Sequence, residues 1–184
     1  MAERCALHVL FVCTGNICRS PIAERLAESY GARLQISNFS ASSAGTRAVV
    51  SHPIHPNAAI ALEKLGGEPS NFAARQFTPK IASHADLVLA MTRAHRDTVL
   101  EQAPRFLRKV FTLTEAAILI SQFDPRDVAD LGALRSHVAA HELSDIPDPI
   151  GQDSEVFAMM GSQIASILPP ILEFCRRLSG PAAD

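Results

Sequence analysis

Residues 7–26 read LHVLFVCTGNICRSPIAERL, and the architecture of the chain can be built outward from them. The apolar run at residues 7–12 indicates a buried β-strand. A short loop containing glycine follows. Pro21 then opens a segment in which Ile22, Leu26 and Tyr30 recur at helical spacing. The stretch therefore predicts a strand, a tight loop and a helix in immediate succession.

The loop separates Cys13 from Arg19 by five residues. Five residues can curl around one tetrahedral anion with their N–H groups pointing inward, and the helix that follows adds the positive end of its dipole. Gly15 and Asn16 are residue types that accept the unusual backbone angles of such a cradle. Arg19 can hold two phosphate oxygens with its planar guanidinium group.

Cys13, at the base of this loop, is the candidate nucleophile. The N–H dipoles and the guanidinium group favour an ionised sulfur at neutral pH, and a thiolate can attack phosphorus. Ser20 can donate a hydrogen bond to the sulfur and help it leave in a second step. A bare Cys-x5-Arg string arises by chance, and an isolated cysteine is usually a small buried hydrophobe. The strand before the loop and the helix after it favour the chemical interpretation.

Two other phosphate-binding motifs are absent from the sequence. The loop lacks the Gly-Lys-Ser/Thr ending of a Walker loop, and no dinucleotide-binding G-x-G-x-x-G occurs.

The rest of the chain alternates between apolar runs and helical patterns. We expect further strands at residues 35–43, 85–91 and 109–113, and helices at residues 56–65, 93–102, 125–140 and 154–178. Pro169 and Pro170 lie inside the last helix and could bend it. Strands alternating with helices predict a parallel sheet covered on both faces. Ligands bind such sheets beyond the carboxyl ends of the strands, which is where Cys13 lies.

Composition and charge limit the partners. Hydrophobic residues make up 47% of the 184 residues and charged residues 20%, which is typical of a globular chain, and the formal net charge is −2. That charge does not suggest binding to nucleic acid or to an anionic membrane. No apolar run in the sequence approaches the roughly 18 residues of a membrane span, and the apolar start is too short for a secretion signal. We therefore expect a cytoplasmic protein.

The cysteines and histidines do not suggest a metal site. Cys5, Cys13, Cys18 and Cys175 have neither a disulfide framework nor zinc-ligand spacing. Cys18 shares the loop with Cys13, so an oxidant could close a protective disulfide between them, although a buried thiol explains it equally well. The seven histidines do not cluster; we expect His52 and His55 in solvent or at a cleft rim, and His95 on an exposed helix face.

Residues 12–24, VCTGNICRSPIAE, resemble the low-molecular-weight protein tyrosine phosphatase family. Further segments agree in order and spacing, namely Ser-Ala-Gly-Thr at 43–46, Ala-Arg-Gln-Phe at 74–77, Ala-Asp-Leu-Val-Leu-Ala-Met at 85–91 and Ile-Pro-Asp-Pro at 146–149. The resemblance covers nearly the whole chain. It implies one α/β domain over residues 1–184 with a flavodoxin-like, four-stranded parallel sheet in the order 2-1-3-4 and helices on both faces. It also implies hydrolysis of a phosphorylated protein or small phosphomonoester through a phosphocysteine, with no metal or organic cofactor.

The resemblance assigns roles to nine residues. Cys13, Arg19 and Asp148 would be catalytic, with Asp148 protonating the leaving group and later activating water. The substrate phosphate would be bound by Thr14, Gly15, Asn16, Ile17, Cys18 and Ser20. Asp145 is the nearest local competitor of Asp148, and we rank it below Asp148.

The recognition residues depart from the family pattern. Tyrosine-directed members line the cleft with aromatic side chains, whereas this chain has no Trp and places Val49 or Val50 on one side and Ile150 and Gly151 on the other. Phe72 lies close to the place of a histidine that braces the loop in other members.

Ile17 bears on the choice of substrate. Members that hydrolyse phosphoarginine tend to carry threonine at this position, so Ile17 resembles the tyrosine-directed type.

The leading hypothesis is therefore a phosphotyrosine protein phosphatase. Two alternatives stay open: the same chemistry on phosphoarginine or a small aryl phosphate, and a non-catalytic phosphate-binding module. The module is disfavoured because binding alone needs neither nucleophile nor acid. Arsenate reductases share the fold and loop but need resolving cysteines in mid-chain, and none lies between Cys18 and Cys175. The oligomeric state is left open.

Overall fold

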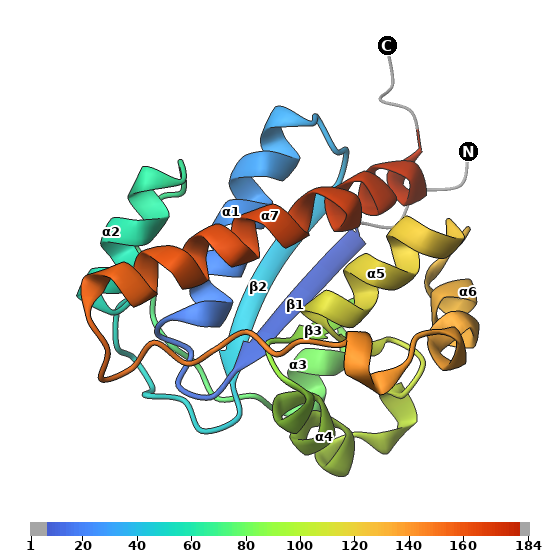
Figure 1. Ribbon diagram of the computed structural model, residues 1–184, viewed down its shortest axis with the longest axis horizontal. Helices are drawn as coiled ribbons and strands as arrows, with labels where there is room; N and C mark the ends of the chain where they lie inside the picture. Colours follow the sequence, from blue (N-terminus) through green and yellow to red (C-terminus); the bar gives the residue numbers. More distant parts are fainter. Residues whose placement is uncertain (1–6, 181–184) are drawn as a thin grey trace.

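Four parallel strands in the order β2-β1-β3-β4 form the centre of the molecule in the computed structural model, which describes residues 7–180 (Figure 1). The strands are β1 (Leu7–Cys13), β2 (Phe39–Gly45), β3 (Leu87–Ala90) and β4 (Val110–Thr112). β1 lies between β2 and β3, and its last residue, Cys13, pairs with Gly45. The predicted sheet and its strand order are confirmed.

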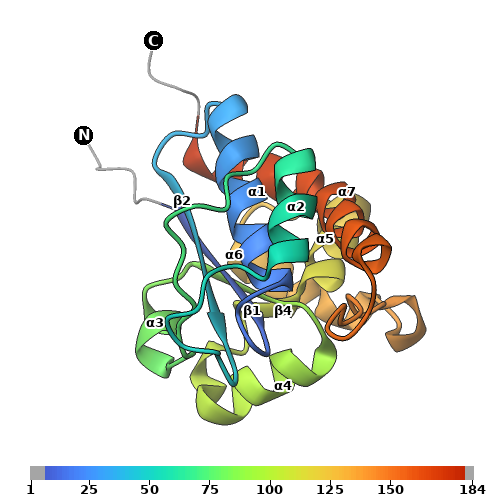
Figure 2. The same cartoon turned by 90° about the vertical axis from the view of Figure 1, so that its left-hand side faces the viewer.

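Helices cover both faces of this sheet, and β1 explains why. Val9, Phe11 and Cys13 belong to one buried cluster, whereas Leu10 and Val12 belong to a second. Both sets are apolar because both faces are covered, so β1 reads as a continuous apolar run. α1 (Arg19–Arg33), α2 (Pro56–Lys64), α5 (Leu113–Phe123) and α7 (Ser154–Ser179) lie on one side, and α3 (Pro79–Ser83) and α4 (Arg93–Gln102) on the other (Figure 2).

α7 is the longest helix of the described residues, and Pro169 and Pro170 lie within it without ending it. By length and hydropathy alone this helix reaches what a membrane span requires, contrary to the sequence expectation. Its apolar residues, including Phe157, Ile164 and Leu168, are buried in the core beside α1, α2 and α5. That packing is typical of a core helix in a globular domain.

Three sequence expectations were wrong in detail. The second strand begins at Phe39 rather than residue 35, because Gln35 and Asn38 adopt left-handed backbone angles that break an extended run. The strand expected at residues 109–113 ends at Thr112, and α5 (Leu113–Phe123), for which the sequence analysis expected no helix, follows it directly and begins with a capping box between Thr112 and Glu115. Residues 125–140, expected as one helix, instead contain a short α6 (Val128–Ala133) and a 3₁₀ turn (Leu134–His137), and a second 3₁₀ turn (Ala140–Glu142) follows.

Candidate active site

In the loop between β1 and α1, most carbonyl groups accept hydrogen bonds, whereas the N–H groups are free. Its carbonyl oxygens accept hydrogen bonds of 2.8–3.0 Å from N–H groups outside the loop; the pairs are Cys13 with Thr46, Thr14 with Arg47, Gly15 with Val49 and Ile17 with His55. Within residues 7–180, the N–H groups of residues 14–18 donate no hydrogen bond. Five consecutive free donors at the start of a helix provide the binding site that a tetrahedral oxyanion requires. We call residues 13–20 the cradle.

The backbone angles of the cradle depend on Asn16 rather than on Gly15. Asn16 has a φ of 56°, in the left-handed region that asparagine tolerates. Gly15 does not have a positive φ, and a Cβ atom there would lie 3.4 Å from Ile17 and 3.5 Å from Val49, an ordinary contact distance. Its small size therefore widens the cleft. The glycine that the loop requires is Gly45, since a Cβ atom there would clash with the Thr14 carbonyl oxygen.

The Asn16 side chain ties the cradle to the neighbouring strand. Its amide nitrogen donates to the Ser20 hydroxyl at 2.9 Å and to the Ser43 hydroxyl at 2.8 Å, and its oxygen accepts from the Arg75 N–H at 2.9 Å. Ser43 in turn donates to the carboxylate of Glu24. Burial raises the pKa of Glu24, although the hydrogen bond from Ser43 opposes that shift. This network fixes the loop before any ligand arrives.

Sequence reasoning missed the bracing roles of Ser43, Arg75 and Glu24. All three residues lie in segments that carried the resemblance. Their position in those segments, rather than their residue type, could have pointed to these roles. Phe72, near the place of the bracing histidine, instead packs beneath the Arg25 guanidinium, 5.7 Å from the ring centre. The backbone of Arg75 supplies the hydrogen bond to Asn16.

The two cysteines of the cradle differ in environment. The Cys13 sulfur lies 2.9 Å from the Ser20 hydroxyl, at the carboxyl end of β1, and lines the cleft. Burial, with smaller contributions from Cys13 and Asp148, raises the pKa of the Cys18 thiol to about 12 against the opposing effect of Arg19. Cys18 is therefore protonated at neutral pH and cannot be the nucleophile. Both thiols are free, so a Cys13–Cys18 disulfide stays a prediction.

Arg19 reaches from the cradle to the loop that carries Asp148. Its guanidinium group is 5% exposed and donates to the Asp148 carboxylate at 2.9 Å and to the Ile146 carbonyl at 3.1 Å. The Asp148 side chain is half exposed at the mouth of the cleft. Asp145 instead accepts a hydrogen bond from the Arg93 N–H. Of the two candidate acids, the structure places Asp148 beside the cradle.

The cleft above Cys13 has a volume of about 280 Å³ and combines a polar floor with apolar walls. Thr14, Gly15, Ile17 and Cys18 line it beside the three catalytic candidates, whereas Asn16 and Ser20 are buried behind it. The apolar walls include Val49 and Ile150, and the charged side chain of Arg47 also lines the cleft. None of the lining residues, all within 7–180, is aromatic, as expected from the sequence, and neither Val50 nor Gly151 is among them.

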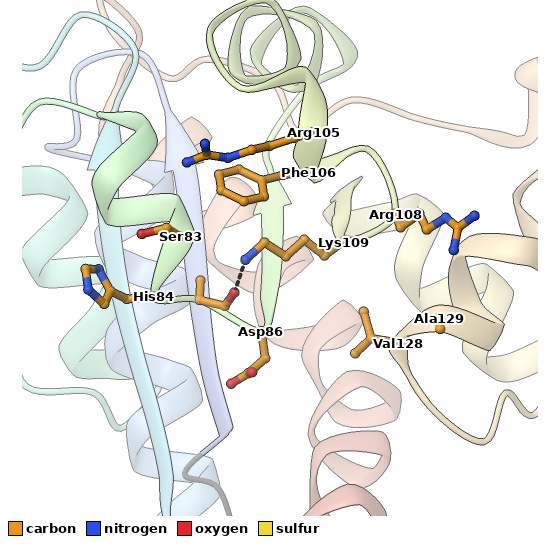
Figure 3. A pocket seen from close by; sticks show the side chains of 10 residues that line it. Ser83, His84, Asp86, Arg105, Phe106, Arg108, Lys109, Val128 and Ala129 are labelled. Atoms are coloured by element: carbon orange, nitrogen blue, oxygen red, sulfur yellow. Dashed lines mark hydrogen bonds between the residues drawn. The ribbon is translucent and has the colours of Figure 1, made fainter.

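A second hollow lies at the opposite ends of the strands, before β3 and β4 (Figure 3). Arg105, Arg108 and Lys109 give it positive charge, but Lys109 already donates to the carbonyl groups of Ala82 and Ala85. Its lining holds no cysteine. The nucleophilic chemistry therefore belongs to the cleft above Cys13. Within the described part of the chain, no group of three or more His, Cys, Asp or Glu residues could hold a metal ion.

Two histidines have roles that sequence reasoning did not predict. His95 is only 7% exposed, so the expectation of an exposed helix face was wrong. Its Nε2 atom lies 2.7 Å from the Thr14 hydroxyl. His55 accepts a hydrogen bond at the start of α2 and stacks on Phe157 with ring centres 4.7 Å apart. No spacing in the sequence joins His95 to Thr14, because 81 residues separate them.

Comparisons with known proteins found relatives in sequence and in structure. The family model described as low molecular weight phosphotyrosine protein phosphatase matches residues 8–130. A putative low molecular weight protein-tyrosine-phosphatase from Klebsiella pneumoniae is 32% identical over 150 residues, which cover 82% of this chain and 84% of that protein. A protein-arginine-phosphatase from Bacillus subtilis is 41% identical over 110 residues, covering 59% of this chain and 71% of its own length.

Solved structures of related phosphatases also match this chain. A crystal structure of a YwlE mutant from Bacillus subtilis matches with a TM-score of 0.74 at 28% identity, covering 91% of this chain and 97% of that one. The tyrosine phosphatase Wzb from Escherichia coli K30, in complex with sulphate, matches with a TM-score of 0.69 at 26% identity, covering 90% and 96%. The chain belongs to the low molecular weight phosphotyrosine protein phosphatase family.

Proposed function

We propose that this chain is a protein-tyrosine-phosphatase that hydrolyses phosphomonoesters through a phosphocysteine intermediate. The observation that carries this proposal is the set of five free N–H groups of residues 14–18, at a loop that also holds Cys13 and Arg19. A tetrahedral phosphoryl group bound by these donors would have its phosphorus atom next to the Cys13 sulfur. Donors fixed before binding stabilise the charge that develops in the transition state.

In the first step the Cys13 thiolate attacks phosphorus while the bond from phosphorus to the ester oxygen breaks. Asp148 gives its proton to the departing oxygen, which leaves as an alcohol or phenol. In the free enzyme Asp148 is paired with Arg19. A substrate phosphate competes for that guanidinium group and so releases Asp148, whose carboxylate takes up a proton from the substrate monoanion or from solvent before it acts as the acid.

In the second step a water molecule attacks the phosphocysteine, and Asp148 takes a proton from that water. The sulfur–phosphorus bond breaks and inorganic phosphate forms. Cys13 leaves as a thiolate, and the Ser20 hydroxyl, 2.9 Å from the sulfur, can stabilise it with a hydrogen bond. Every proton is thus returned, and the enzyme regains its starting state.

The proposed substrate is a phosphotyrosine protein. Ile17 supports this choice, since threonine is the residue expected for phosphoarginine. A phosphoarginine protein is the second candidate: the Bacillus subtilis relative is named a protein-arginine-phosphatase, and the aliphatic walls at Val49 and Ile150 offer no ring on which a phenyl group could stack.

The proposed location is the cytoplasm. The three cysteines in the described residues, Cys13, Cys18 and Cys175, are all free, which is typical of a reducing compartment.

The experiment measures hydrolysis of p-nitrophenyl phosphate by the wild type, Cys13→Ser and Cys175→Ala. Cys13→Ser should abolish turnover, because a serine hydroxyl stays protonated where a thiolate is needed. Cys175→Ala removes a buried cysteine in α7 and should leave turnover within about twofold. Turnover that survived in Cys13→Ser would rule out the nucleophile. A panel of matched peptides carrying phosphotyrosine, phosphoarginine or phosphoserine then ranks the substrates by kcat/KM.

A further inference from the structure

His95 is a buried titratable side chain beside the cradle that takes no part in the proposed reaction steps. It lies in the first turn of α4, on the opposite face of the sheet from α1. Its Nε2 atom is 2.7 Å from the Thr14 hydroxyl, and its Nδ1 atom is 2.9 Å from the Thr92 hydroxyl. Both ring nitrogens are thus engaged with threonine side chains.

The imidazole of His95 is neutral at physiological pH. Burial, and to a smaller extent the charge of Arg19, lowers its pKa to about 4, although Asp148 and Asp145 oppose the shift. A neutral imidazole has one donor and one acceptor nitrogen, and a hydroxyl group can serve as either partner. His95 can therefore satisfy both threonines at once without bringing a positive charge next to Arg19.

Thr14 is the first residue of the cradle after the nucleophile, and its N–H group is one of the five free donors. Its carbonyl oxygen accepts from the Arg47 N–H at 3.0 Å. The hydrogen bond to His95 adds a second anchor, from the side chain. The Thr14 carbonyl shares a peptide group with the Gly15 N–H, so holding both the carbonyl and the side chain restricts the rotation that would turn the Gly15 donor away from a bound phosphate.

The corner between β3 and α4 joins the cradle to the acid loop. The Met91 N–H donates to the Val12 carbonyl at 2.8 Å, directly before the nucleophile, and the Ile146 N–H donates to the Met91 carbonyl at 2.9 Å. Arg93 in the same corner donates its N–H to Asp145 at 2.8 Å. His95 therefore connects Thr14 to a segment that also holds the loop of Asp148.

We propose that His95 is a positioning residue, which acts through the Thr14 hydroxyl to hold the first amides of the cradle in their oxyanion-binding arrangement relative to Cys13. This role rests on the proposed phosphatase function. It predicts that removing either partner weakens oxyanion binding and that removing both costs no more than removing one. Such a site binds tightly because its N–H donors are already held in place; mobile donors would have to be ordered on binding, which costs free energy.

The test is a double-mutant cycle with His95→Leu, Thr14→Val and the combined variant. For each protein, the dissociation constants of inorganic phosphate and orthovanadate are measured by calorimetry, and kcat and KM are measured on p-nitrophenyl phosphate. We expect each single variant to bind vanadate about tenfold more weakly, as the loss of one anchoring hydrogen bond would give. The double variant should bind no more weakly than either single variant. His95→Gln, which keeps a hydrogen-bonding group, should recover part of the loss.

Vanadate affinity within twofold of the wild type in both single variants would overturn the proposal, as would losses that multiply in the double variant. Thr78→Val is the matched control, because it removes the hydroxyl that caps α3 away from the cleft, and it should leave vanadate binding unchanged. If His95→Leu does not fold, Thr14→Val, which keeps the shape of the side chain, decides alone. Phosphate binding without turnover in the wild type would refute the proposed function while leaving the positioning role testable.

Discussion

The cradle and the rim of the same cleft are built in opposite ways. In the cradle, Cys13, Asn16 and Arg19 are at most 4% exposed, and each takes part in a side-chain hydrogen bond. On the rim, Val49 is 38% exposed and Ile150 50% exposed, and their side chains can make no hydrogen bond. Phosphoryl transfer tolerates little displacement of its groups, whereas recognition uses whatever side chains face the substrate. The comparison indicates that reaction type is set by the cradle and substrate choice by the rim.

Asp148 is the residue that could break this division, because it is half exposed and yet catalytic in our account. Asp148→Asn keeps the size of the side chain but cannot donate a proton as an acid does. We expect kcat on phenyl phosphate to fall by roughly 10²–10⁴-fold, the effect of a lost general acid. The loss on p-nitrophenyl phosphate should be smaller, since its leaving group departs more readily without a proton.

The matched control for that prediction is Asp145→Asn, which changes the neighbouring carboxylate paired with Arg93. It should stay within about threefold of the wild type on both substrates. Equal losses on phenyl and p-nitrophenyl phosphate would contradict the assignment of Asp148 as the acid.

The burial of His95 beside the cradle can be tested through the pH dependence of stability. Its pKa of about 4 in the folded protein lies below the ordinary value of 6.5, so between these values the unfolded chain binds more protons. The stability that neutral His95 contributes is complete above pH 6.5 and is lost as the pH falls towards 4. The shift corresponds to a loss of about 3 kcal/mol over that window. Urea unfolding of the wild type and His95→Leu at several pH values measures it.

Other groups also titrate between pH 6.5 and pH 4, so the informative quantity is the difference between the two proteins. The free energy of unfolding of the wild type should fall more steeply with decreasing pH than that of His95→Leu. Parallel curves would mean that His95 is not held neutral in the folded protein.

The smallest effect is expected on the rim. Val49→Trp places an aromatic ring on a wall of the cleft where no aromatic side chain lies now. Stacking between aromatic rings contributes about 0.5–1.5 kcal/mol, so kcat/KM for a phosphotyrosine peptide should rise by roughly 2–10-fold. For a phosphoserine peptide, which has no ring, it should stay unchanged. A similar change for both peptides would show that the rim does not select by stacking.

The cradle was predictable from the sequence because its members are contiguous. Residues 13–20 carry the nucleophile, the donors and the guanidinium group within one loop between a strand and a helix. The strand before them, β1, could be predicted from its apolar run, which is buried on both sides. Asp148 could be placed only through the order of motifs along the whole chain. Gly15 and Asn16 were both expected to adopt unusual backbone angles, and only Asn16 has a positive φ, because residue type alone does not fix φ.

What could not be predicted depends on contacts between distant segments. His95 sits among charged residues in the sequence, and only the packing of α4 against the sheet shows that its ring is buried against Thr14. Glu115 is likewise buried at 2% exposure, where it pairs with Arg135 from a later 3₁₀ turn. The start of α5 was different, since Thr112 and Glu115 form a local capping box that the sequence did contain.

The most direct measurement is the site of phosphorylation during turnover. The enzyme is mixed with p-nitrophenyl phosphate, quenched in acid within milliseconds, and its peptides are analysed by mass spectrometry. We expect one phosphoryl group on Cys13, formed as fast as the first equivalent of nitrophenol is released. A quenched enzyme that carries no phosphoryl group during active turnover, or carries it on another residue, would contradict it.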